Sequence, residues 1–240
     1  MSKIITIVSG KGGAGKTTLA VYLGRALAAR GKAVLLVEMD AGLRGMDLML
    51  GVASAAVYDL SDVLCGRCKP SQAVMLAPGA QGLHLLAAAN DPGYIPDSAA
   101  FEGFLGLCRS CYDFILFDSP AGFGRGFALS ASACTLALAV AVPEPVSVRA
   151  CARAGQLLCR YGDAQQRLII NKVPPRLRGV EDLDAVIDGA GIQLIGAVPL
   201  DCELETAAMQ GRGLNPCPAG AAIENIAARL CGEYRDLLLQ

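Results

Sequence analysis

The sequence has no tryptophan, one histidine and few aromatic or charged side chains. Of its 240 residues, 5% are aromatic and 18% are charged, and the formal net charge is -1. Proteins that hold nucleic-acid phosphates non-specifically carry an excess of lysine and arginine, so this balance argues against that class. The single histidine, His84, lies in an apolar segment and is interpreted as structural rather than catalytic.

No apolar run is long enough to cross a bilayer. The longest, Ala133–Val142, has about half the length that a transmembrane helix requires, and it predicts a strand buried in a parallel sheet. The N-terminus lacks the organisation of a signal peptide, because an apolar strand begins by Ile4. We therefore expect a cytoplasmic protein.

Cysteine, by contrast, is abundant. Of the 10 cysteines, Cys65 with Cys68 and Cys108 with Cys111 have the spacing that lets two thiolates reach one zinc ion or iron–sulfur cluster. A predicted strand separates these pairs, and the other cysteines follow no spacing. This favours small apolar residues that fill gaps in the core, with a metal site as the alternative.

Apolar segments of strand length alternate with helical segments along the chain. This order predicts an α/β fold, with a mostly parallel twisted sheet of about seven or eight strands flanked by helices on both faces. The predicted strands are 4–9, 33–37, 83–87, 114–118, 136–142, 168–171 and 193–197. The predicted helices are 16–30, 57–76, 98–110, 126–132, 146–161, 180–189, 202–210 and 219–239. Because no linker or repeat divides the chain, residues 1–240 are expected to form a single domain.

The segment SGKGGAGKTT, Ser9–Thr18, follows the first predicted strand and opens the first predicted helix. It fits the phosphate-loop pattern G-x4-G-K-[ST], whose glycines let backbone N–H groups surround a phosphate at a helix N-terminus. Lys16 is expected to reach the β and γ phosphates, and the Thr17 hydroxyl to ligate Mg²⁺. The predicted nucleotide-binding residues of the loop are Gly12, Gly13, Ala14, Gly15, Lys16, Thr17 and Thr18.

Acidic side chains follow the neighbouring strands, at the edge where open α/β folds bind ligands. Asp118 ends the strand FILFD and is predicted to hold Mg²⁺ through a water molecule; the alternative is a cap on the next turn. Asp40 follows the second strand and is the candidate for orienting the attacking water; the alternative is a solvated loop carboxylate.

Together these motifs resemble the MinD/ParA family of ATPases. KGGAGKTT is similar to the deviant Walker A box of that family, whose hallmark is an extra lysine at its start, here Lys11. Over about residues 1–230, further segments resemble the MinD branch in order and spacing: MDAGLRGMDLMLGV, VYDLSDVL, FDSPAG, EPVSVR, IGAVPLD and AAMQGRGL. The resemblance implies a P-loop NTPase fold of the SIMIBI, nitrogenase iron protein-like class. It also implies a slow, partner-stimulated ATPase with ATP and Mg²⁺ as cofactors.

The resemblance implies further roles for individual residues. Lys11 would cross an ATP-bound homodimer to the phosphates of the partner, and would form the catalytic set with Lys16 and Asp40. Asp40 matches the switch I aspartate, and Asp118 the switch II (Walker B) acid. Asn171 lies where the family reads adenine, although a turn at the strand end explains it as well. In the MinD branch, the ATP-bound dimer binds the membrane, MinC and MinE, and acts in septum placement.

The sequence departs from that branch near the second strand and in one predicted helix. Glu38 stands where the family usually has aspartate, which leaves the hydrolysis rate open. Gly45 replaces a usual asparagine, and SVRACAR lacks the acidic residues common in that helix, which forms a partner surface in the family. Binding of MinC-like or MinE-like regulators is therefore expected to be altered.

The last predicted helix also departs from the branch, which ends in a basic amphipathic helix that inserts into membranes. Here acidic residues outnumber basic ones, so we expect the membrane-targeting tail to be absent or reduced. Membrane contact at the inner face of the cell membrane is expected to be weak or indirect. The apolar residues at helical spacing predict a face that packs on the core: Ile223, Ile226, Leu230, Tyr234, Leu237 and Leu238.

Three other functions remain as alternatives. A ParA-like partition ATPase, or a FlhG-like regulator of flagellar number, would use the same machinery with other partners, although the near-neutral charge counts against DNA. An Mrp-type carrier of metal clusters would use the paired cysteines. A small-molecule kinase would need a lid, and the sequence has no arginine-rich lid segment.

Overall fold

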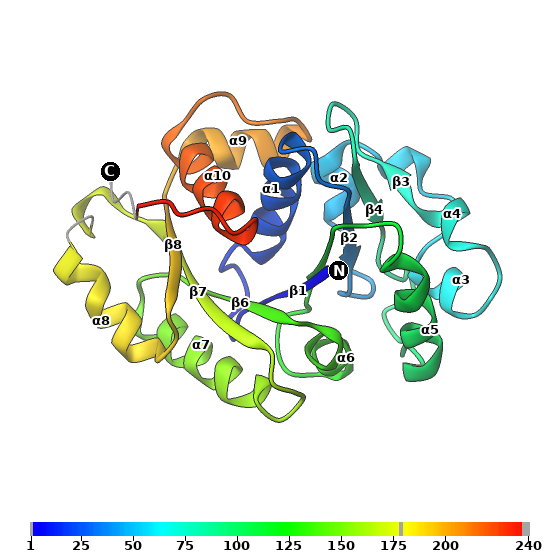
Figure 1. Cartoon of the computed structure of the whole chain (residues 1–240), viewed down its shortest axis with the longest axis horizontal. Coiled ribbons are helices and arrows are strands. Elements are labelled where there is room, and N and C mark those ends of the chain that lie inside the picture. The colour runs from blue at the N-terminus through cyan, green and yellow to red at the C-terminus, as the bar shows by residue number, and fades with distance from the viewer. Residues whose placement is uncertain (1, 178–179, 237–240) are drawn as a thin grey trace.

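A computed structural model describes residues 2–177 and 180–236, which form an eight-stranded sheet with helices on both faces (Figure 1). The strand order is β3-β4-β2-β5-β1-β6-β7-β8, and every pairing is parallel except β3 with β4. This confirms the predicted fold class. The strands are β1 Lys3–Val8, β2 Val34–Glu38, β3 Met75–Leu76, β4 Leu83–Leu86, β5 Phe114–Asp118, β6 Leu136–Ala141, β7 Gln165–Val173 and β8 Leu194–Pro199.

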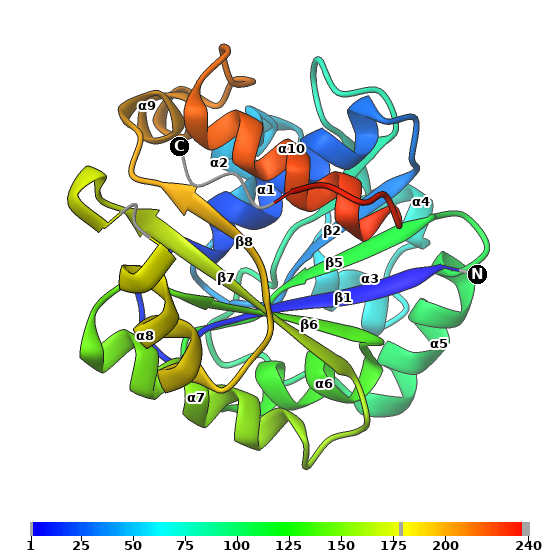
Figure 2. The ribbon, with the colours of Figure 1, turned by 60° about the vertical axis from the view of Figure 1, so that its left-hand side comes forward.

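The helices form two layers, which Figure 2 shows above and below the sheet. They are α1 Lys16–Ala29, α2 Met46–Leu50, α3 Leu60–Leu64, α4 Pro70–Ala73, α5 Ser98–Cys108, α6 Arg125–Ala133, α7 Pro145–Leu158, α8 Val180–Ala190, α9 Cys202–Gln210 and α10 Pro218–Leu230. In β1, Ile5 and Ile7 pack with α1 and α10, whereas Ile4 packs with α5 and Val8 with α6 and α7. The side chains of β1 thus pack into the cores on both faces of the sheet, as expected for a strand buried on both faces.

The seven predicted strands are confirmed with small shifts of their ends. The prediction of one helix over 57–76 is wrong, because this segment contains α3, α4 and the edge strand β3. Asp59 caps α3 by accepting hydrogen bonds from the backbone N–H groups of Ser61 and Asp62. Gly66 then adopts a left-handed φ of 70°, which stops the helix, and Pro70 starts the next one.

The last helix is shorter than predicted. It ends at Leu230 rather than near 239, because Gly232 turns the chain with a φ of 90°. The guanidinium of Arg229 then donates to the carbonyls of Arg235 and Asp236.

The packing face of α10 is confirmed in part. Ile223, Ile226 and Leu230 are buried, whereas Tyr234 is exposed beyond the helix end. Leu237 and Leu238 lie outside the described residues. Among the described residues, no helix is both long and apolar enough to cross a membrane.

The contact between α10 and β8 gives a direct test of this packing. Ile226 is fully buried against Gly196, where an added Cβ would overlap the Ile226 side chain. Ile226→Ala should lower the free energy of unfolding by about 2–5 kcal/mol, because it leaves a cavity in the core. Urea unfolding followed by circular dichroism measures this loss. Glu224→Ala, on the exposed side of α10, should change stability by less than about 0.5 kcal/mol; equal effects would contradict the packing.

Candidate nucleotide site

The phosphate loop, residues 9–15, runs from the end of β1 to the start of α1 and touches two other elements. An added Cβ at Gly10 would overlap the carbonyl of Ala150 in α7, and one at Gly15 would overlap the side-chain amide of Asn171 in β7. Gly15 also has a φ of 89°, which favours glycine. The glycines therefore let the loop backbone lie directly against α7 and β7.

Thr17 and Asp118 meet at the carboxyl edge of the sheet. Parallel pairing of β1 with β5 places Asp118 opposite Ile7, next to the loop. The Thr17 hydroxyl donates to Asp118 Oδ2 over 2.6 Å. Lys16, the first residue of α1, has only 8% of its surface exposed beside them. The structure thus brings together the predicted phosphate-binding and Mg²⁺-binding side chains.

Asp118 is buried with an incomplete set of hydrogen bonds. Its side chain is 3% exposed, and its Oδ1 has no hydrogen-bond partner among the described residues. Burial raises the pKa of Asp118 to about 7, against the opposing effects of the Thr17 hydrogen bond and the charge of Lys16. A carboxylate oxygen without a partner beside a threonine hydroxyl is a donor set that fits Mg²⁺.

Glu38 has a role that the sequence did not reveal. Its carboxylate accepts hydrogen bonds from the backbone N–H groups of Gly45 at 2.7 Å and Met46 at 3.1 Å, and a longer one from Ala88 at 3.4 Å. The side chain is buried, and this burial raises its pKa despite those hydrogen bonds. Glu38 therefore fastens the loop after β2 to the start of α2. The only sequence signal was a side chain longer than the usual aspartate.

Asp40 lies on the loop that Glu38 fastens. The side chain is half-buried, and this burial raises the pKa of Asp40. The positive charge of Lys16 lowers that pKa, so the carboxylate lies within electrostatic reach of the Lys16 ammonium. The backbone of the loop is also joined to the Asp118 strand, since Met39 N–H donates to the Asp118 carbonyl over 3.0 Å. Water orientation by Asp40 stays a prediction.

Lys11 points to the surface rather than into its own loop. Its ammonium donates to Glu144 Oε2 over 2.7 Å, and the two side chains are 43% and 58% exposed. Glu144 immediately precedes α7. The segment EPVSVR begins with Glu144, but its pairing with Lys11 was not predicted, because the two residues are far apart in the chain and come together where β1 pairs with β6.

The side chain of Asn171 contacts the phosphate loop of its own chain. Its side-chain amide donates to the Ala14 carbonyl over 2.8 Å, and it is 3% exposed, so it braces the phosphate loop. Its Oδ1 has no hydrogen-bond partner among the described residues. Contact with adenine stays a prediction.

The other residues singled out from the sequence lie outside this site. The described residues contain no group of three or more histidine, cysteine or acidic side chains that could hold a metal ion, so the paired cysteines do not form a common centre there. His84 is in β4 with its ring edge-on to Tyr112, and burial lowers its pKa, which agrees with a structural role.

Comparison with known families and sequences gives consistent matches. Residues 5–214 match the CobQ/CobB/MinD/ParA nucleotide-binding domain. The chain is 36% identical to a putative septum site-determining protein MinD of Emiliania huxleyi, over 99% of this chain and 90% of that protein. It is 34% identical to septum site-determining protein MinD of Bacillus subtilis, over 97% of this chain and 90% of that protein.

Solved structures give the same result. The MinD cell division protein of Aquifex aeolicus superposes with a TM-score of 0.88 at 32% identity, covering 99% of this chain and 100% of that one. A MinC:MinD complex from the same organism has a TM-score of 0.87 at 33% identity, covering 99% and 98%. MinD of Pyrococcus horikoshii complexed with Mg-ADP has a TM-score of 0.85 at 28% identity, covering 96% of each chain.

The buried carboxyl of Asp118 predicts a pH-dependent stability. Its pKa of about 7 in the folded chain lies above the ordinary 3.8, so the stability that it contributes is lost as the pH rises from about 4 to about 7. Asp118→Asn removes the ionisation and keeps an acceptor for Thr17. Without nucleotide, the variant should melt several degrees above the parent at about pH 8, since 1 kcal/mol corresponds to about 2–4 °C in a chain of this size. At about pH 4.5 the two melting temperatures should nearly coincide; a constant difference would contradict the assignment.

Proposed function

The chain belongs to the CobQ/CobB/MinD/ParA family of nucleotide-binding proteins and is a MinD-like ATPase of septum placement, and we propose that ATP switches it by pairing two copies through Lys11. ATP and Mg²⁺ are its cofactors. Slow hydrolysis that a regulator accelerates, and the homodimer itself, are parts of the proposal.

The orientation of Lys11 carries this proposal. The phosphate-loop motif has two lysines, and the buried Lys16 is sufficient to hold phosphate within one chain. Lys11 is exposed and binds Glu144 instead. An exposed ion pair is worth only about 0–1 kcal/mol, so a triphosphate on a facing copy can readily replace Glu144 as the partner of Lys11.

The remaining site residues act on the nucleotide bound to their own chain. We assign to the loop N–H groups and Lys16 the binding of the phosphates, and to Thr17 and Asp118 the holding of Mg²⁺. Bound Mg²⁺ would offset the negative charge of the phosphates. Asp40 orients water, and Glu38 supports this by fixing the loop that carries Asp40.

We also propose a MinC-like regulator as a partner, since one of the similar structures is a MinC:MinD complex. The helix α7, which begins beside Glu144, exposes Arg149 and Arg153, and Arg160 is exposed just after its end. A regulator that docks on α7 would therefore need an acidic surface there.

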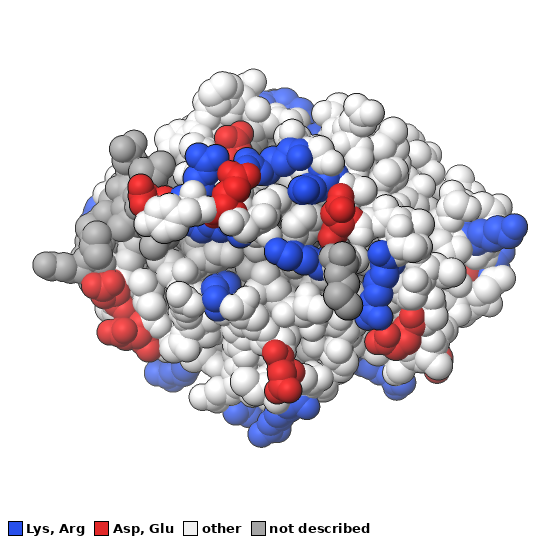
Figure 3. Space-filling model, in the orientation of Figure 1, with Lys and Arg blue, Asp and Glu red and all other residues white. Residues whose placement is uncertain are grey.

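We expect no specific nucleic acid partner. On the face that Figure 3 shows, acidic and basic side chains are interspersed, rather than gathered into a basic stripe. We place the protein in the cytoplasm, with weak or indirect contact with the inner face of the membrane. The apolar side of α10 supports this placement, because it packs in the core and is not available to lipid.

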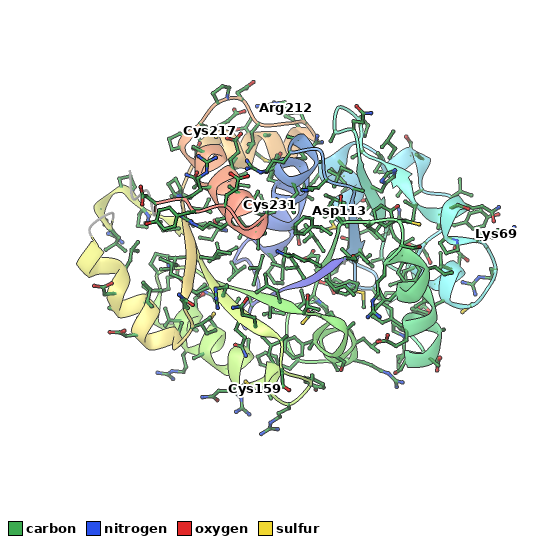
Figure 4. The ribbon with its side chains drawn as sticks, viewed as in Figure 1. Lys69, Asp113, Cys159, Arg212, Cys217 and Cys231 are labelled. Carbon is green, nitrogen blue, oxygen red and sulfur yellow. The ribbon has the colours of Figure 1, made fainter. Side chains whose placement is uncertain are left out.

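The first test of the proposal is the mass of the protein in solution. With ATP and Mg²⁺, the parent protein should become a dimer, and Lys11→Ala should stay monomeric because it lacks the group that reaches the other copy. Light scattering after size exclusion measures this, and ADP binding by the variant shows that its loop is intact. Lys69→Ala, far from the loop (Figure 4), is the matched control and should dimerise normally. A parent protein that stays monomeric in ATP would refute the proposal.

A second test separates dimerisation from hydrolysis. Asp40→Ala should leave ATP-dependent dimers intact but lower phosphate release by about 10²-fold, because the attacking water is no longer oriented. The dimers should consequently persist longer after ATP is removed. Asp163→Ala, at an exposed position after α7, should behave as the parent. Normal phosphate release by Asp40→Ala would remove Asp40 from the reaction.

A further inference from the structure

A cavity of about 1040 Å³ lies between α1 and α10, and no phosphate-loop residue lines it. Its other walls are the turn 79–82 between β3 and β4 and the segment 213–217 before α10. Figure 4 labels Cys217, on this last wall, near the top of the molecule. The volume is slightly above the usual range for sites that hold small molecules, about 300–1,000 Å³.

Glycines leave this space open. At Gly31, Gly79 and Gly213, an added Cβ would meet no atom within 4 Å. Gly31 and Gly79 have φ values of 76° and 67°, which side chains rarely adopt. Two of the turns that border the cavity thus favour glycine for backbone reasons, and the walls there carry no side chains that could fill it.

Arg25, on α1, places a positive charge in the wall, and no acidic side chain of the described residues pairs with it. Its Nε is buried and has no hydrogen-bond partner among the described residues, and one terminal nitrogen makes only a long 3.4 Å contact with the Pro78 carbonyl. Burial lowers the pKa of Arg25, and the only neighbouring group that raises it is Tyr22. A half-buried guanidinium without a counter-charge is costly, and its planar fork of N–H donors suits a carboxylate.

The rest of the lining combines aliphatic side chains with polar ones, which include Lys32, Gln81 and Asn215. Ala26, Leu214 and Pro216 contribute aliphatic surface. Within residues 2–177 and 180–236, Tyr22 is the one aromatic residue of the lining, and its hydroxyl already donates to the Arg212 carbonyl over 2.9 Å. The wall therefore lacks the pair of aromatic faces between which a base would stack. Glu224, the acidic residue of the described lining, is exposed on α10 and does not influence the pKa of Arg25.

We propose that this cavity binds a small amphipathic carboxylate, with its carboxylate on the Arg25 guanidinium and its apolar chain against Ala26, Leu214 and Pro216. The ligand supplies the missing counter-charge and covers the apolar wall. This site is separate from the nucleotide cycle proposed above, and neither proposal depends on the other.

Calorimetric titration of the full, nucleotide-free chain with decanoate, below its micelle concentration, tests the proposal. Decanoate should bind with one molecule per chain. Acetate, which lacks the chain, and decanol, which lacks the charge, should each bind at least tenfold more weakly. This comparison uses the parent protein only, so it does not depend on the folding of a variant. No binding of decanoate, several molecules per chain, or equal binding of decanol would each overturn the proposal.

A variant then tests the role of Arg25 itself. Arg25→Gln should weaken decanoate binding at least tenfold and leave decanol binding unchanged, because only the charged hydrogen bonds are lost. Unchanged ADP binding would show that the variant is folded. Arg160→Gln, which removes an exposed arginine from the end of α7, is the matched control and should bind decanoate as the parent does. Equal decanoate affinity of Arg25→Gln and the parent would refute the assignment.

Discussion

The nucleotide site depends on the close approach of the phosphate loop to α7 and β7. Gly10 lies directly against the Ala150 carbonyl, and Gly15 against the Asn171 amide, so neither position has room for a side chain. The loop is therefore held from both sides before any nucleotide binds, which reduces the ordering that binding would require. The same contact joins the loop to α7, whose first turn follows Glu144, the partner of Lys11.

The neighbouring strands β2 and β5 each end in a buried acidic residue at the carboxyl edge of the sheet. The two carboxyl groups differ in their hydrogen-bond partners. Glu38 lies opposite Asp118 in the pairing of β2 with β5. The carboxylate of Glu38 is satisfied by backbone N–H groups, so it serves the loop after β2. Asp118 has only the Thr17 hydroxyl, and one of its oxygens has no partner among the described residues. An incompletely paired acid at the end of a parallel strand is costly for folding, and it is also what a cation site needs.

The parts of the structure that the sequence predicted follow from local pattern and topology. Most of the strands are short segments dominated by apolar residues, and the phosphate-loop motif is recognised from a few consecutive residues. The position of Asp118 beside the loop also follows from the sequence, because the carboxyl ends of parallel strands lie at one edge of the sheet. The pairing of Lys11 with Glu144 and the bonds of Glu38 depend on side-chain reach across the fold, which no local pattern encodes. The error at 57–76 has a similar origin, since an Asp59 cap and a left-handed Gly66 override an apolar pattern of helical period.

The central claim is that Lys11 acts on the nucleotide of a second copy, whereas Asp40 acts within its own chain. Mixing Lys11→Ala protein with Asp40→Ala protein tests it most directly, by the rate of phosphate release from ATP. In a mixed dimer, the chain that lacks Lys11 keeps its own Asp40 and receives the lysine of the other chain. The account therefore predicts that the mixture hydrolyses ATP faster than the sum of the two variants alone. A mixture that remains as inactive as its components would contradict it.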